Sequence, residues 1–133
     1  MPEFDYTIDV PVRYRDLDPL GHVNNAVYAS YMEQARVSYV EDVVGEMSAD
    51  GGAVVATLDI EFERPIHRGE TVTVGVGATD VGTSSIPLGY EIRTEEGLAA
   101  TGTTLMVTVD EDGEARPIPD SWRAAITERE DLA

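Results

Sequence analysis

The sequence predicts an α+β fold in which a five-stranded antiparallel sheet wraps around one long central helix. Residues 25–43 carry apolar side chains at helical spacing, and four other stretches alternate apolar and polar residues, which is typical of half-buried strands. Short turns join the strands that follow the helix, as in antiparallel hairpins. One helix can cover five strands only if the sheet curls around it, so we expect the helix in the concave face.

The first element along the chain is a strand, expected over Thr7–Tyr14. Pro11 has no N–H to donate to a neighbouring strand, so we expect it at a sheet edge or a bulge. Side chains alternate between the two faces of a strand. The apolar face is therefore expected to consist of Ile8, Val10, Val12 and Tyr14.

The long helix is expected to begin at Asn25 and to run for about 19 residues. Asn24 or Asn25 can cap its first turn, because a side-chain amide oxygen accepts bonds from unpaired N–H groups there. Gly45 suits the position just after the last helical residue. The buried stripe is expected to comprise Val27, Tyr28, Tyr31, Ala35, Ser38, Tyr39, Asp42 and Val43.

Four more strands are expected to complete the sheet. The first three have apolar faces formed by Val54, Ala56, Leu58, Ile60 and Phe62, then by Val72, Val74, Val76 and Ala78, and then by Ile86, Leu88, Tyr90 and Ile92. The last strand, roughly Leu98–Val109, is apolar or small on both faces, which indicates a central position or a bulge. A short helix within Pro117–Glu128 is expected to follow.

Length and composition narrow the classes of protein. A chain of 133 residues is most simply one domain, residues 1–133, with a single core. No long apolar run and no signal-peptide pattern is present, so we expect a cytoplasmic protein that does not enter a membrane. The absence of cysteine excludes disulfides, zinc–thiolate sites and a cysteine nucleophile.

The charge balance is strongly acidic, with 26 Asp and Glu against nine basic residues, all of them Arg. A net charge of −17 repels phosphate backbones, so we do not expect nucleic-acid binding. The carboxylates are spread along the chain, as on the surface of a halophilic protein that works in molar salt. The alternative is an ordinary acidic protein.

Two segments resemble a known family. Residues 12–36, VRYRDLDPLGHVNNAVYASYMEQAR, are similar to the start of the 4-hydroxybenzoyl-CoA thioesterase family of hotdog-fold proteins, with its Asp-x-Asp pair and Tyr-x-x-Tyr-x-Glu-x-x-Arg helix. Residues 60–74, IEFERPIHRGETVTV, resemble the second and third strands of that family. The resemblance implies a hotdog fold and an acyl-CoA thioesterase, here an acidic member of the haloarchaeal type.

The resemblance also implies roles for particular residues. Asp18 corresponds to the family's catalytic carboxylate, either a general base or a nucleophile. The backbone N–H of Asn25 would polarise the thioester carbonyl, and Gly21 would let the backbone approach the substrate closely. Apart from any family, a helix N-terminus offers unpaired donors and a partial positive charge that suit a developing oxyanion.

Each of these residues also has a structural interpretation. Asp18 before Pro19 can simply initiate a turn. His22 can position substrate or water, or be a structural histidine. Asn24 is expected to contact the substrate, and the structural alternative is that it is only the N-cap of the helix.

Other arrangements of the polar residues are less favoured. Asp16 is expected to bond locally or to pair with an arginine, and Glu33 to pair with Arg36. A metal site formed by Asp16, Asp18 and His22 is weighed and not favoured. A Ser-His-Asp triad is not expected either, because Ser84-Ser85 lacks a nucleophile elbow.

One locally basic segment, ERPIHRG, contains Arg64, His67 and Arg68. These side chains would bind the phosphates of coenzyme A, for which the arginine fork is well suited. The alternative is that the arginines pair with Glu61, Glu63 or Glu70.

The sequence therefore predicts a thioester hydrolase that acts on acyl-CoA, with no cofactor beyond the coenzyme A of the substrate. A homodimer or homotetramer is expected, because the sheet edges and a Thr- and Gly-rich outer face need covering. Two alternatives remain open: a thioesterase for acyl groups on acyl-carrier protein, and a module that binds acyl-CoA without cleaving it.

Overall fold

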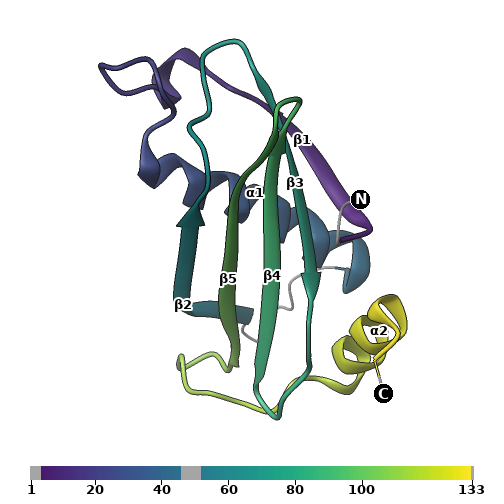
Figure 1. The fold of residues 1–133 in the computed structure, drawn as a ribbon. Helices are drawn as coiled ribbons and strands as arrows, with labels where there is room; N and C mark the ends of the chain where they lie inside the picture. Colours follow the sequence, from purple (N-terminus) through teal and green to yellow (C-terminus); the bar gives the residue numbers. More distant parts are fainter. Residues whose placement is uncertain (1–3, 46–51, 133) are drawn as a thin grey trace.

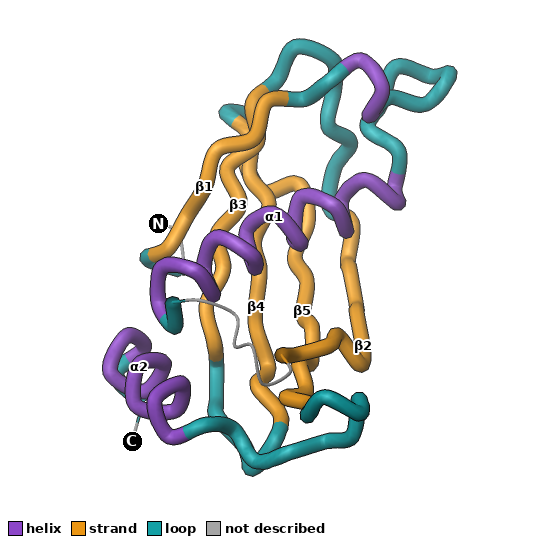
Figure 2. The backbone as a smooth tube through the Cα atoms, turned by 180° about the vertical axis from the view of Figure 1, so that it is seen from behind, coloured by secondary structure: helices purple, strands orange, loops and turns teal. Residues whose placement is uncertain are grey.

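The computed structural model describes residues 4–45 and 52–132 and contains one five-stranded antiparallel sheet. The elements are β1 (Tyr6–Pro11), a 3₁₀ turn η1 (Tyr14–Asp16), α1 (Asn25–Val43), β2 (Gly52–Phe62), β3 (Thr71–Ala78), β4 (Ser85–Thr94), β5 (Gly97–Val109) and α2 (Asp120–Glu130). The strand order is β1-β3-β4-β5-β2. Helix α1 crosses the concave face of the sheet (Figure 1 and Figure 2), so the predicted fold class is confirmed.

Strand β1 is shorter than predicted. Among the described residues it pairs with β3 alone, at a sheet edge, and it ends at Pro11, so the edge position predicted for Pro11 is confirmed. The chain then turns into η1, where the Arg13 N–H donates to Asp16 Oδ2 (2.8 Å). The prediction that Tyr14 lies on the buried face is wrong, because this turn leaves its side chain 80% exposed.

Helix α1 begins and ends where the sequence predicts. Asn24 is the N-cap, and its side-chain oxygen accepts the Ala26 N–H at 2.9 Å. Gly45 follows the helix with a φ of +95°, a conformation that favours glycine. The buried face includes Met32 and Val40, which the predicted stripe omits, while Asp42 is exposed and its Oδ2 accepts the Tyr6 hydroxyl at 2.5 Å.

The inner faces of β3 and β4 are buried as predicted. Strand β5 pairs with β4 on one side and β2 on the other, so the central position predicted for it is confirmed. Strand β2 is the second edge and carries a register shift between Val55 and Thr57. Helix α1 packs chiefly against β1 and β3, so the apolar side chains of β2 are only partly covered. The β2 side chains that stay 41–52% exposed are Val54, Val55, Leu58 and Phe62.

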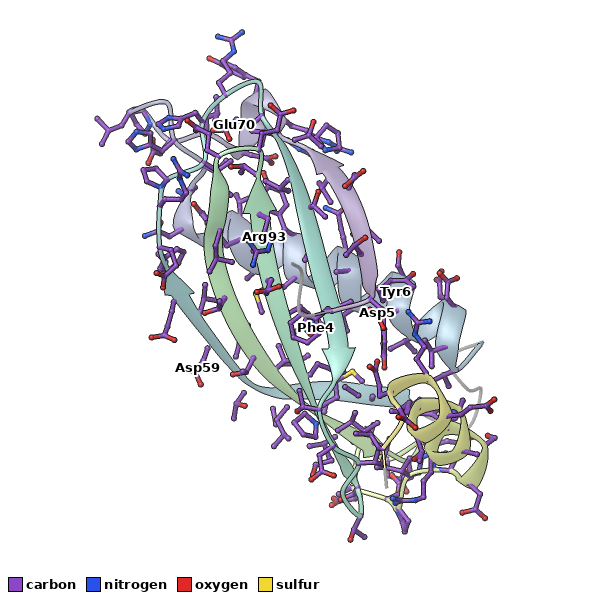
Figure 3. The ribbon with its side chains drawn as sticks, turned by 45° about the vertical axis from the view of Figure 1, so that its right-hand side comes forward. Phe4, Asp5, Tyr6, Asp59, Glu70 and Arg93 are labelled. Atoms are coloured by element: carbon purple, nitrogen blue, oxygen red, sulfur yellow. The ribbon has the colours of Figure 1, made fainter. Side chains whose placement is uncertain are left out.

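The outer face of the sheet is covered in part by the chain's own N-terminal segment. Phe4 lies across Gly75, Gly77 and Gly89, and Figure 3 shows it on this face. A Cβ at Gly89 would lie 2.8 Å from Phe4 Cζ, closer than packed atoms allow. Part of the glycine-rich surface for which the sequence suggests a partner is therefore filled from within.

Helix α2 lies at the end of the molecule away from the loops that precede α1 (Figure 1). The hydroxyl of Tyr39 on α1 donates to Glu130 Oε2 at 2.5 Å and accepts the Ala78 N–H at 3.3 Å. This buried hydroxyl ties α2 to both the helix and the sheet. In residues 4–45 and 52–132, no helix is long and apolar enough to cross a membrane.

Candidate active site

The loop between η1 and α1 is a tight turn closed by backbone bonds. Leu17 and Val23 form an antiparallel bridge, and the Asp18 N–H donates to the His22 carbonyl at 2.8 Å. Gly21 has a φ of +84°, and nothing lies within 4 Å of the point that a Cβ would occupy there. Within the chain, glycine is thus needed here for its backbone conformation rather than for space.

The Asp18 carboxylate has one engaged oxygen and one free oxygen. Its Oδ1 accepts the Leu20 N–H (2.9 Å) and the His22 N–H (3.2 Å), so Asp18 does stabilise the turn. Oδ2 has no hydrogen-bond partner within the described ranges, and the side chain is half-buried. The turn therefore fixes the orientation of the carboxylate and leaves one oxygen able to attack or to accept a proton.

The start of α1 leaves one backbone donor unused. The Asn24 N–H donates to the Asp16 carbonyl at 2.8 Å, and the Ala26 N–H is capped by the Asn24 side chain. The N–H of Asn25, the first helical residue, meets no acceptor among the residues that the structure describes. It sits at the positive end of the helix dipole, which favours a partial negative charge.

The Asp16 carboxylate anchors the loop to α1. Its Oδ2 accepts the Tyr31 hydroxyl at 2.9 Å in addition to the Arg13 N–H. Burial, and next the bond to Asp16, raises the pKa of Tyr31 above its ordinary value, so the phenol stays protonated. Nowhere in residues 4–45 and 52–132 do three His, Asp or Glu side chains group so that they could hold a metal ion.

The basic segment after β2 packs against this loop. His22 and His67 form a backbone bridge with ring centroids 4.9 Å apart, and the Val23 N–H donates to the Ile66 carbonyl at 2.8 Å. The guanidinium of Arg68 lies over the ring of Tyr14. Both histidines and Arg68 are thus brought close to the start of α1.

Arg64 has different contacts from His67 and Arg68, the other basic residues of this segment. Its Nη2 pairs with the Glu96 carboxylate at 3.6 Å, and its Nη1 donates to the Glu96 carbonyl in the turn between β4 and β5. None of the three glutamates considered from sequence is the partner. Glu70 instead accepts the His67 N–H (2.8 Å) through its side chain, and this bond stabilises the turn.

Sequence reasoning missed a polar cluster beneath α1. Arg36 donates to the Tyr90 hydroxyl at 3.3 Å, and this hydroxyl lies 2.7 Å from Thr104 Oγ1. Arg36 also pairs with Glu33 at 3.8 Å, as predicted. These groups adjoin a hollow of about 250 Å³ lined by Ala29, Ser30, Glu33, Arg36, Val55, Leu58 and Thr104. In the sequence, this cluster could have been anticipated only from Tyr90, whose hydroxyl needs a partner on the apolar face of β4.

A larger hollow, of about 700 Å³, lies against α2 at the other end of the molecule. Its lining contains Asp80, Asp120, Glu128 and Asp131 with a single arginine, Arg123. Such a lining repels an anionic ligand, and no residue of the loop around Asp18 takes part in it. The chemistry is therefore better sought at the start of α1.

Comparison with known proteins identifies the family. A model described as the thioesterase-like superfamily matches residues 12–126. The chain belongs to the thioesterase-like superfamily. It is 37% identical to a thioesterase from Thermus thermophilus, whose crystal structure is complexed with coenzyme A and Zn, with a TM-score of 0.89 and 98% of each chain covered. The hotdog fold and the class of thioester hydrolase are therefore established.

Two curated relatives of this superfamily member bear on the substrate. YneP of Bacillus subtilis, provisionally named an acyl-CoA thioesterase, is 28% identical over 109 residues, which cover 78% of this chain and 79% of YneP. The acyl-acyl carrier protein thioesterase ATL2 of Arabidopsis thaliana is 37% identical over 68 residues, which cover 48% of this chain and 36% of ATL2. Both carriers of the acyl group thus occur among the relatives of this chain.

Proposed function

We propose that this protein hydrolyses acyl-CoA to a free acid and coenzyme A, with Asp18 as the catalytic carboxylate and the Asn25 N–H as the oxyanion donor. One observation carries the proposal: within residues 4–45 and 52–132, a carboxylate oxygen and an N–H without partners occur on one short loop, closed by its own backbone bonds, and on the first helical residue that follows it. Within the superfamily, we infer an acidic, salt-adapted member related to the 4-hydroxybenzoyl-CoA thioesterases.

The chemistry requires stabilisation of negative charge on the thioester oxygen. The Asn25 N–H and the helix dipole supply it as the carbonyl carbon becomes tetrahedral. Asp18 Oδ2 either removes a proton from the attacking water or attacks the carbon itself to form an anhydride that water then cleaves. In both routes the C–S bond breaks, and a proton ends on the coenzyme A thiol. Gly21 permits the turn that presents the carboxylate.

The loops around the start of α1 suit the phosphates of coenzyme A. Arg68 has no carboxylate partner within the described ranges, and the exposed His67 lies beside it. Arg64 is already paired with Glu96, so only the part of its charge that Glu96 does not neutralise can attract a phosphate. We therefore assign phosphate binding to Arg68 and His67 first. Asn24 shapes the site as the N-cap, and the His22 N–H holds Asp18 in place.

The acyl group would extend from Asn25 into the hollow beside α1. Ala29, which lines that hollow, lies four residues along the helix, a rise of about 6 Å. Leu58 and Val55 supply apolar contacts there, and Arg36 lies at its polar side. A substrate held with its carbonyl at Asn25 can therefore place its acyl chain between α1 and β2.

The exposed edge of β2 supports the proposal of a homodimer. An unpaired edge with half-exposed apolar side chains is a template for another strand. A second copy that pairs along β2 in a twofold arrangement would cover Leu58 and Phe62 and close the hollow beside them. A homotetramer would need a further contact surface.

The test is release of free thiol from short, long and aromatic acyl-CoA thioesters, in molar KCl and in dilute buffer. The chain has no cysteine and adds no thiol background. Asp18→Asn should lower kcat about a hundredfold or more, as expected for loss of a positioned base or nucleophile. Asp5→Asn, the same change on an exposed residue of the N-terminal segment (Figure 3), is the matched control.

Absence of turnover on every acyl-CoA by folded wild-type protein would contradict the proposal. Acyl groups on acyl-carrier protein would then be assayed in the same way, because the similarity to ATL2 favours that substrate as the second candidate. Intact acyl-CoA that binds stoichiometrically would instead indicate a binding module.

A further inference from the structure

Tyr14 is an aromatic residue that neither the core nor the proposed chemistry uses. Its side chain is 80% exposed, although it lies on η1, close to the candidate active site. One contact orients it: the guanidinium carbon of Arg68 lies 5.7 Å from the centroid of its ring. The two loops that flank the start of α1 therefore meet at an exposed aromatic–guanidinium pair.

Arg68 has no carboxylate partner among the residues that the structure describes. Arg68 also forms no side-chain hydrogen bond with these residues, whereas Arg13 and Arg15, the sequence neighbours of Tyr14, line a separate hollow beside Tyr31. The chain has 26 acidic residues to nine basic ones, so the unpaired state of Arg68 is not explained by a shortage of carboxylates. A free guanidinium fork next to a ring fits a ligand that is both flat and anionic.

We propose that Tyr14 and Arg68 bind the adenosine 3′,5′-bisphosphate part of coenzyme A, with the purine stacked on the Tyr14 ring and a phosphate bound by Arg68. The inference rests on the proposed acyl-CoA substrate and adds a subsite to it. Every purine presents a flat π-face to an aromatic ring, and phosphate accepts paired bonds from guanidinium. No other part of coenzyme A combines these two features.

The distance from the reaction centre is compatible with this placement. The Asp16 carbonyl accepts the Asn24 N–H, and Tyr14 lies two residues before Asp16, a span of at most about 7 Å. The pantetheine arm of coenzyme A is longer than this. A purine on Tyr14 and a thioester at Asn25 can therefore belong to one bound molecule.

The subsite would also select the carrier of the acyl group. An acyl-carrier protein presents the same thioester on phosphopantetheine but has no purine. Stacking on Tyr14 would therefore favour acyl-CoA over acyl-carrier protein by the full contribution of the base.

The experiment combines binding and kinetics on the full chain at one fixed salt concentration. Binding of adenosine and of adenosine 3′,5′-bisphosphate is measured by calorimetry, and hydrolysis is compared for acyl-CoA and for the acyl-pantetheine with the same acyl group. Tyr14→Ala should weaken binding of adenosine and of adenosine 3′,5′-bisphosphate about 5- to 150-fold and raise KM for acyl-CoA by a similar factor, without raising KM for acyl-pantetheine. Tyr14→Phe keeps the ring and should bind like wild type.

Arg68→Gln separates the two halves of the subsite, because it should weaken binding of the bisphosphate but not of adenosine. Equal losses with acyl-CoA and acyl-pantetheine would overturn the proposal, since they indicate a structural role for Tyr14. No effect of Tyr14→Ala, or no binding of the bisphosphate by wild type, would overturn it as well. Tyr14-dependent binding without hydrolysis of either thioester would support the subsite and refute the proposed enzymatic function.

Discussion

The oxyanion donor proposed for this site is a backbone N–H, and proline at position 25 removes it without adding another polar group. Asn25 is the first residue of α1, where proline is well tolerated because the N–H there has no partner within the helix. The preceding residue already has the extended ψ of 137° that a following proline requires. Asn25→Pro should therefore change the free energy of unfolding by less than about 1 kcal/mol.

The expected effect on catalysis is large. Loss of one oxyanion donor costs about 3–4 kcal/mol of transition-state stabilisation, which lowers kcat on the order of 100- to 1000-fold. KM should change little, because the donor acts mainly on charge that develops in the transition state. Asn25→Ala keeps the N–H and is the matched control for the side chain.

The assay is free-thiol release over a range of acyl-CoA concentrations up to saturation, with far-UV circular dichroism and urea unfolding of the same samples. A folded Asn25→Pro variant with the kcat of wild type would refute the role of this N–H. A variant in which only KM rises would show that the group binds the ground state and the transition state equally.

Three other predictions concern stability and assembly. Burial raises the pKa of Tyr31 and of the other buried tyrosines of α1. The free energy of unfolding should therefore not depend on these groups below pH about 10 and should fall above it, because the unfolded phenols lose their protons first. Tyr31→Phe should make that fall less steep in urea unfolding measured at several pH values. Gly89→Ala should cost about 1–3 kcal/mol by overpacking against Phe4, and Phe4→Ala should remove most of that added cost in a double-mutant cycle, whereas additive effects would refute the contact. Leu58→Asp should dissociate the proposed dimer in light scattering, whereas Val37→Asp, a change at a similarly exposed position on α1, should not.

Local chemistry explains what could be predicted from sequence. The bounds of α1 follow from its apolar spacing, from Asn24 as N-cap and from Gly45 after the last turn. The buried faces of β3 and β4 follow from strict alternation. The turn that carries Asp18 could be anticipated because an aspartate before a proline favours one.

The remaining features depend on residues far apart in the chain. Tyr31 bonds to Asp16 across 15 positions and Arg64 to Glu96 across 32, and no local pattern selects one partner among many carboxylates. The exposure of Tyr14 was missed because alternation continues through it in the sequence, whereas the backbone leaves the sheet at Pro11. The half-exposed face of β2 depends on how far α1 reaches across the sheet, which periodicity does not report.

Gly77 is the place where segments from opposite ends of the chain converge. A Cβ at this position would lie 3.1 Å both from Phe4 Cδ1 and from Glu130 Oε2. Residues 4 and 130 are thus neighbours in space. A short engineered linker could therefore join Phe4 to Glu130, and the chain could be reopened at the exposed turn around Glu95 and Glu96. Such a circular permutant would keep the loop around Asp18 continuous while tethering the two segments that lie over Gly77.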